Sequence, residues 1–270
     1  MVGNILDKEN GYLTLLSTAT RRPIDIVEIS CPGARDAMFN MDDSKIFTTC
    51  QQEPKGMAVI DVESRKEIKM VPIKGGRAGG MDPQGKYFMV SASKSVHFFD
   101  SQTAELVKTI KVPGGGGNFT CLKDGSKCYV GLRKANAVGV IDMAKLELMK
   151  TIETGPDANR LYLNPGNSRY GLFANEAGKS DIVSIIDTQL DVKVKDIWTG
   201  LGPHNVAFDP DGKFAVISTK KENVATLVDT GSADPNDWDV ITTDLDSGIQ
   251  NNGVRWVPSP AALKKALAQN

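Results

Sequence analysis

Short runs of apolar and β-branched residues alternate with turn residues along the whole chain. Between Gly200 and Ser218 the sequence reads GLGPHNVAFDPDGKFAVIS, which is a Gly-containing loop, a short strand, an Asp-Gly turn and a second strand. No segment of similar length in the repeating part of the chain shows the 3.6-residue period of an amphipathic helix. The pattern therefore predicts an all-β protein built from antiparallel strands.

The same order of elements recurs six times. Each unit contains a strand ending in two apolar residues and an acidic one, a second strand, a Gly-rich loop, and two strands joined by a tight turn. Units of this length and content are typical of the blades of a β-propeller, whereas a TIM barrel or Rossmann fold needs a helix after each strand. The anchor residues at the end of the first strand lie 39 to 45 residues apart: Ser17, Asp61, Asp100, Asp142, Asp187 and Asp229.

We expect one propeller domain over residues 1–270. Six blades are predicted, and a seventh, degenerate blade is the alternative. The last repeat lacks its final strand, and residues 1–9 align with the missing strand, so the N-terminal segment is expected to close the ring. The ending SPAALKKALAQN, with Ser259 as N-cap and Pro260 at the first helical position, predicts a short helix over 259–270. The predicted repeats lie near residues 10–52, 53–93, 94–134, 135–178, 179–222 and 223–258.

The repeats share the pattern VIDxxxxxxxxxI…GxxPxxxxxxPDGKxxxVS, which is clearest from Ala137 to Ser218. This pattern resembles the YVTN family of β-propeller repeats, found in surface-layer propellers, amine-dehydrogenase subunits and the d1-haem domain of cytochrome cd1. The family's name motif is matched only loosely, by LFAN at Leu172 to Asn175. The resemblance implies a propeller fold and an exported location, but it carries little information on activity, since propellers host unrelated functions.

The composition of the chain argues against several classes of binding partner. The chain has 32 Lys and Arg against 33 Asp and Glu, so its charge favours neither nucleic acid nor an anionic membrane surface. No run of 18 apolar residues occurs, and we expect no membrane insertion. The N-terminal sequence MVGNILDKEN lacks the basic and apolar regions of a signal peptide. The expected location is periplasmic or extracellular, with a cytoplasmic one left open.

Two of the four cysteines flank a predicted hairpin turn in the sequence CLKDGSKC. With Asp124-Gly125 at the tip, Cys121 and Cys128 lie opposite each other on paired strands, where a disulfide can form. The alternative is a pair of reduced, half-buried thiols. No CxxC spacing indicates a zinc or redox motif, and we expect no metal site.

Aligning the repeats on their turns brings two adjacent positions of each, most of them polar, to the mouth of the predicted channel. Arginine offers a planar pair of donors to a carboxylate or phosphate, and a histidine can exchange a proton near neutral pH. His204 is therefore a tentative catalytic residue, against the simpler interpretation that polar side chains at a channel mouth only face solvent. The candidate ligand-binding residues are Arg35, Arg77, Asn118, Asn159, Arg160, His204, Asn205 and Asn252.

Three functions are compatible with these residues. The first is a binding or scaffold module that presents the polar channel mouth to a small anionic molecule or a protein partner, without a cofactor. The second is a metal-independent enzyme of the lyase, isomerase or lactonase type, in which Arg35 and Arg77 hold an organic acid and His204 moves a proton. The third, implied only by the family resemblance, is d1-haem-related redox or carrier chemistry, which needs an axial ligand and a large pocket.

Overall fold

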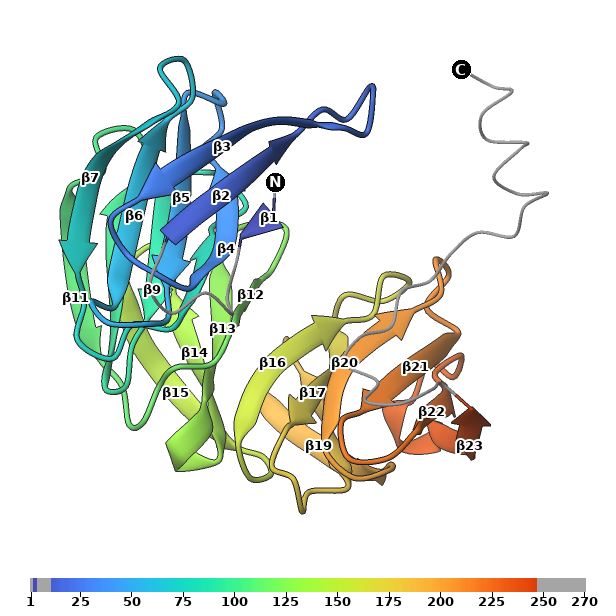
Figure 1. The fold of residues 1–270 in the computed structure, drawn as a ribbon. Helices are drawn as coiled ribbons and strands as arrows, with labels where there is room; N and C mark the ends of the chain where they lie inside the picture. Colours follow the sequence, from blue (N-terminus) through green and yellow to red (C-terminus); the bar gives the residue numbers. More distant parts are fainter. Residues whose placement is uncertain (1, 4–10, 247–270) are drawn as a thin grey trace. The chain divides into compact units, whose positions relative to one another are not determined.

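The computed structural model describes residues 2–3 and 11–246, and these residues form antiparallel sheets (Figure 1). Twenty-three strands and two short 3-10 helices, η1 (Arg133–Ala135) and η2 (Pro235–Asp237), make up the regular structure of this part of the chain. The chain divides into two compact units, Met1–Leu161 and Tyr162–Asn270, and each is described by itself. No helix among the described residues is both long and apolar enough to cross a membrane.

The first unit contains one three-stranded sheet and three four-stranded sheets, in which neighbouring strands along the chain pair with each other. The three-stranded sheet is β1 (Val2–Gly3), β2 (Gly11–Leu16) and β3 (Pro23–Ile29). The next sheet is β4 (Ala34–Phe39), β5 (Lys45–Cys50), β6 (Gly56–Asp61) and β7 (Lys66–Pro72). The two that follow are β8 (Ala78–Met81), β9 (Tyr87–Ser91), β10 (Ser95–Asp100) and β11 (Leu106–Lys111), then β12 (Phe119–Cys121), β13 (Lys127–Leu132), β14 (Ala137–Asp142) and β15 (Glu147–Glu153).

Two further four-stranded sheets follow, and the boundary between the units falls inside the first strand of the first of them. That sheet is β16 (Ala158–Leu163), β17 (Tyr170–Asn175), β18 (Ile182–Asp187) and β19 (Val192–Trp198). The last is β20 (Pro203–Phe208), β21 (Phe214–Thr219), β22 (Val224–Asp229) and β23 (Asp239–Asp246).

The core lies between consecutive sheets, and the inner strands are buried on both faces. In β6, Met57 and Val59 belong to one buried cluster while Ala58 and Ile60 belong to the next. Because successive side chains of a strand point to opposite faces, a continuous apolar run fills both interfaces. The fourth strand of each sheet is more exposed, as Ile68 of β7 illustrates.

The six anchor residues have one common structural role. Each closes the turn after its strand by accepting a hydrogen bond from a backbone N–H two or three positions ahead. Asp187, for example, accepts from the N–H groups of Gln189 and Leu190 at 2.8 and 3.0 Å. Equivalent bonds are accepted by Ser17, Asp61, Asp100, Asp142 and Asp229.

The sequence repeats and the sheets are offset by two strands. The repeat near 53–93, for example, supplies β6 and β7 to one sheet and β8 and β9 to the next. At the N-terminus, β1 pairs with β2, with Val2 opposite Thr14 and Gly3 opposite Leu13. Most of the predicted closing segment 1–9, the end of the sixth repeat from residue 247 on and the predicted helix 259–270 lie outside the described residues.

Candidate functional site

A cavity of about 460 Å³ opens among the loops of the first unit, and we call it the loop cavity. Its walls come from the loops that follow the second and fourth strands of three consecutive sheets. These loops bring polar groups and glycine backbone together, and no aromatic side chain is among the described residues of the wall. The lining residues are Gln51, Lys55, Gly75, Gly76, Arg77, Ser93, Gly115, Gly116, Arg133, Lys134 and Asp157.

Positive charge predominates in the loop cavity. Among the described residues that line it are four cationic side chains, those of Lys55, Arg77, Arg133 and Lys134, and one carboxylate. That carboxylate, Asp157, pairs with the guanidinium of Arg133, whose side chain is only 14% exposed. Together the lining cations give the cavity positive charge and donors of the kind that bind carboxylate or phosphate groups.

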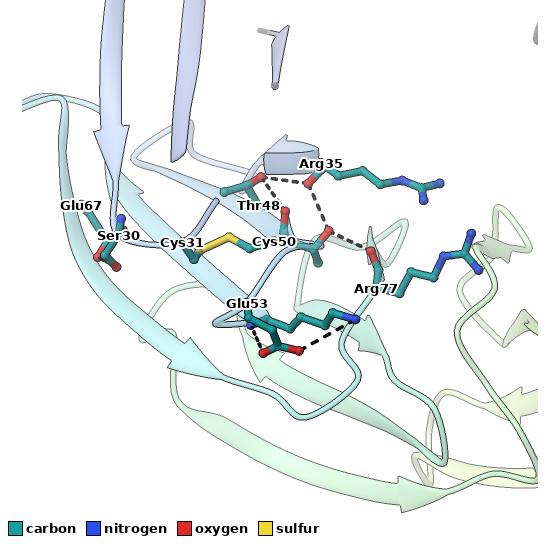
Figure 2. The surroundings of a disulfide bond; sticks show 10 residues. Ser30, Cys31, Arg35, Thr48, Cys50, Glu53, Glu67 and Arg77 are labelled. Atoms are coloured by element: carbon teal, nitrogen blue, oxygen red, sulfur yellow. Dashed lines mark hydrogen bonds and ion pairs between the residues drawn. A yellow bond between two sulfur atoms is a disulfide. The ribbon is translucent and has the colours of Figure 1, made fainter. Parts of the chain in front are cut away.

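Arg77, a predicted ligand-binding residue, is held by its backbone so that its side chain reaches the loop cavity. Its carbonyl oxygen accepts hydrogen bonds from the Thr49 hydroxyl at 3.3 Å and from Gln51 Nε2 at 3.2 Å. The Thr49 hydroxyl lies 3.1 Å from the carbonyl of Arg35 as well. Figure 2 shows the side chains of Arg35 and Arg77 extending in the same direction, away from a nearby disulfide.

That disulfide joins Cys31 to Cys50 and fixes the base of this arrangement (Figure 2). Both cysteines are fully buried, and Cys50 comes one residue after Thr49 and one before Gln51. The cross-link therefore anchors the two side chains that hold Arg77. Sequence reasoning did not single out this pair, because Cys31 and Cys50 lie 19 residues apart on different elements.

A second disulfide joins Cys121 to Cys128 across β12 and β13. The register places the two residues directly opposite each other, with the Asp124-Gly125 turn between them. Gly125 has a φ of +71°, which glycine adopts without strain, and its N–H bonds the Leu122 carbonyl at 2.9 Å. None of the four cysteines is free.

Three other predicted residues of the first unit meet through their side chains. Arg35 Nη2 donates to Asn118 Oδ1 at 3.3 Å, and Asn118 Nδ2 donates to Asn159 Oδ1 at 3.0 Å. Arg35 also pairs with the carboxylate of Asp36 at 3.2 Å, where β4 has an irregularity and Asp36 has a φ of +50°. The Arg35 and Asn118 side chains thus bind protein groups in the first unit.

A smaller cavity of about 260 Å³ lies against the first strands of the same sheets, β4, β8 and β12. Two predicted residues, Asn118 and Arg160, line it together with Asp36. Its remaining wall includes the apolar side chains of Met38 and Phe119. Its described lining has one cation and one carboxylate, which makes it less suited to an anion than the loop cavity.

In the second unit, His204 forms part of a chain of hydrogen-bonded side chains. Its Nε2 lies 3.1 Å from Glu176 Oε1, and its Nδ1 lies 2.8 Å from Asn205 Nδ2. Asn205 Oδ1 accepts from the Tyr162 hydroxyl at 2.6 Å, and Lys220 Nζ lies 3.1 Å from Glu176 Oε2. Both ring nitrogens of the predicted catalytic histidine therefore have side-chain partners, and the Glu176 side chain is only 3% exposed.

Of the predicted ligand-binding residues, only Arg77 lines the loop cavity, and Asn252 lies outside the described residues. The sequence prediction missed Lys55, Arg133, Lys134 and Asp157 because it aligned only two adjacent positions before each strand pair. A signal for three of them was present in the loops after the second strands, which read QQEPKG and GLRKAN in the first and third four-stranded sheets. No group of three or more His, Cys, Asp or Glu that could hold a metal occurs in the described part of the chain.

The two histidines also bear on haem binding, which the family resemblance implied. His97 Nε2 lies 2.9 Å from the Ser95 hydroxyl, and its Nδ1 lies 3.1 Å from the Thr109 hydroxyl. Because both imidazoles already have partners at both nitrogens, neither offers a ready axial ligand.

Comparison with solved structures identifies the fold. No protein-family model matches the sequence, and no curated protein matches it significantly. Hydrazine synthase from Kuenenia stuttgartiensis superposes with a TM-score of 0.68 at 16% identity, covering 93% of this chain and 84% of that one. A 6-phosphogluconolactonase-like protein from Bacteroides fragilis gives 0.71 at 16% identity, covering 92% and 81%.

A second 6-phosphogluconolactonase-like protein, from Bacteroides uniformis, gives a TM-score of 0.71 at 14% identity, covering 94% of this chain and 83% of that one. Together with the consecutive antiparallel sheets, these similarities show that the chain has a β-propeller fold. Because the sequence identities are so low, the similarities establish only the fold. The assignment of the repeats to the YVTN type stays a prediction.

Proposed function

We propose that this β-propeller binds a small anionic molecule in the loop cavity. The observation that carries the proposal is that four cationic side chains and one carboxylate line it within the described part of the chain. An anion entering this space exchanges water for charge-assisted hydrogen bonds, which are stronger than neutral ones. The volume of about 460 Å³ falls within the range of small-molecule sites.

The arrangement of the loops supports binding more than catalysis. Hydrogen bonds from Thr49 and Gln51 hold the backbone carbonyl of Arg77, and Asp157 holds the Arg133 guanidinium, so the loops that carry these two residues are ordered before a ligand arrives. The enzymatic alternative combined Arg35 and Arg77 of the first unit with His204 of the second. The partners of His204 at both ring nitrogens leave that alternative without a specific observation in its favour.

The proposal is tested by thermal unfolding of the purified protein against a panel of carboxylates and phosphate esters. A ligand that binds only the folded state raises the melting temperature by mass action, so weak binders are visible at high concentration. We expect at least one anion to raise the melting temperature of the wild-type protein, and we expect Arg77→Ala to abolish this rise. The control is Lys150→Ala, which removes one positive charge from an exposed position of β15 and should keep the rise. An equal rise in both variants would overturn the proposal, as would no rise with any anion, which would favour a protein partner.

We also propose that the protein works in an oxidising compartment outside the cytoplasm. Structural disulfides persist in such compartments, and the pairing of all four cysteines supports this location. The test is to alkylate protein taken directly from its cells and count the free thiols by mass. We expect none, and four alkylated cysteines would contradict the proposal.

A further inference from the structure

We infer that the Cys121–Cys128 disulfide is a site of thiol–disulfide exchange, at which a small thiol enters the smaller cavity and forms a mixed disulfide with Cys121. The inference is independent of anion binding, because it concerns the cavity of about 260 Å³ rather than the loop cavity. Its support is the different exposure of the two disulfides, the place of Cys121 in the cavity wall, and the hydrogen bonds that hold the hairpin besides the cross-link.

The two disulfides differ in their access to solvent. Cys31 and Cys50 are each 0% exposed, so a dissolved thiol does not reach that cross-link in the folded protein. Cys128 is also 0% exposed and belongs to an apolar cluster. Cys121 is only half-buried, and it lines the smaller cavity. Because exchange requires a thiolate to reach one sulfur of a disulfide, Cys121 is where the exchange begins.

The smaller cavity also sets the size of the thiol. Its volume of about 260 Å³ falls just below the usual range for drug-sized ligands, which suits a molecule of the size of an amino acid. Phe119 and Thr120, the two residues before Cys121 on β12, line the same cavity. A cysteine-sized thiol in this space therefore lies beside the strand that carries the half-buried sulfur.

The exchange transfers two electrons in two steps. In the first step the thiolate attacks Cys121 Sγ, the bond to Cys128 breaks, and Cys128 leaves as a thiolate that takes up a proton. In the second step another molecule of the thiol attacks the small-molecule sulfur of the mixed disulfide. This releases Cys121 as a thiol and forms a disulfide of two small molecules. In the reverse direction Cys128 attacks Cys121 Sγ, expels the small thiol and restores the cross-link.

The hairpin between the two cysteines has hydrogen bonds that do not involve the sulfur atoms. The Leu122 N–H donates to the Lys127 carbonyl and the Gly125 N–H donates to the Leu122 carbonyl, both at 2.9 Å. The Asp124 carboxylate accepts from the Ser126 N–H at 3.0 Å. Opening this disulfide also releases a shorter loop than opening the other one, with a sequence separation of 7 rather than 19 residues. The cross-link can therefore open while the sheet stays folded.

Reduction of the native wild-type protein tests the inference. The protein is incubated with dithiothreitol, samples are alkylated at intervals, and the modified cysteines are identified by peptide mass. We expect Cys121 and Cys128 to be alkylated at least about tenfold faster than Cys31 and Cys50, with an unchanged circular dichroism spectrum. Equal rates for the two disulfides would overturn the inference. Loss of the spectrum as Cys121–Cys128 opens would also overturn it, because the exchange would then follow unfolding.

Two single variants identify the cysteine that reacts. Cys128→Ser leaves Cys121 as a thiol at the cavity, and the probe cystine should convert it to a mixed disulfide that adds the mass of one cysteine. Cys121→Ser is the matched control, because it leaves the buried Cys128, which should react at least about tenfold more slowly. Equal rates in the two variants, or no reaction of Cys128→Ser with cystine, would overturn the inference.

Discussion

The carbonyl oxygens of Arg35 and Arg77 share one hydrogen-bond donor, the Thr49 hydroxyl, at 3.1 and 3.3 Å. The two arginines lie 42 positions apart on the first strand of one sheet and in the loop before the next. A single fully buried hydroxyl thus connects the first strand of one sheet with the loop that enters the cavity.

Replacing Thr49 with valine removes this connection while keeping the side-chain shape. Two carbonyl groups lose a donor, so we expect the free energy of unfolding in urea to fall by about 1–3 kcal/mol. The control is Thr151→Val on the exposed face of β15, which should change it by less than about 0.5 kcal/mol. Equal effects of the two substitutions would show that the shared hydroxyl does not support this region.

Arg77 itself provides charge and geometry to the proposed site. Arg77→Lys keeps the charge but loses the paired donors, so the affinity for methyl phosphate should fall by about tenfold in calorimetry. Arg77→Ala should lose more, because the charge is removed as well. If Arg77→Lys bound as tightly as wild type, the guanidinium would not contact the anion.

The Cys31–Cys50 disulfide should stabilise the protein more than the Cys121–Cys128 disulfide, because it closes the longer loop. The sequence separations are 19 and 7 residues, and chain entropy gives about 3 and about 2 kcal/mol respectively. Paired serine substitutions at each bridge, compared by urea unfolding, test this order. We also expect only the Cys31→Ser/Cys50→Ser variant to weaken anion binding, since it releases Thr49 and Gln51.

His97 should make the stability of the protein depend on pH. Burial lowers the pKa of His97 below its usual value of 6.5, so the unfolded chain takes up the proton more readily than the folded one. The neutral form of His97 therefore contributes fully to the free energy of unfolding above about pH 6.5. This contribution is lost as the pH falls below that value. Unfolding free energies measured between pH 7.5 and 5.5 should fall less steeply for His97→Gln than for wild type, and parallel curves would refute this role.

His204 and Glu176 should support the second unit rather than a reaction. Removing the imidazole in His204→Ala leaves the Glu176 carboxylate, 3% exposed, with Lys220 but without its histidine partner, and the melting temperature should fall. Anion affinity should not change, because neither residue lines the loop cavity. Loss of binding in this variant with the melting temperature unchanged would revive the catalytic interpretation.

The propeller fold was predictable because local signals repeat. The anchor residue that ends each strand marks the same capped turn in all six copies, as Asp61 and Asp187 show. The assignment of strands to sheets was harder to predict. A repeating sequence looks the same whichever strand is taken as the first of a sheet, as in the repeat 53–93. The boundary is placed by the pairing of β5 with β6 in one sheet and by the assignment of β7 and β8 to different sheets.

The candidate site was predictable only in part. Arg77 follows from aligning the loops before the first strands, but Lys55 and Lys134 reach the same cavity from loops after the second strands. These three residues come together only because of the way neighbouring sheets pack. An alignment of the positions before the first strands does not contain that information. The partners of His204 were equally hidden, since Glu176 is 28 residues away in the sequence.

The central claim, that the loop cavity binds the anion, is tested most directly by a crystal structure grown with selenate, a tetrahedral dianion whose anomalous scattering marks its position. We predict a strong anomalous peak within hydrogen-bond distance of the Arg77 guanidinium, with Lys55 or Lys134 beside it, and no such peak in crystals of Arg77→Ala. A selenate bound elsewhere on the protein, with the loop cavity filled only by water, would contradict the account.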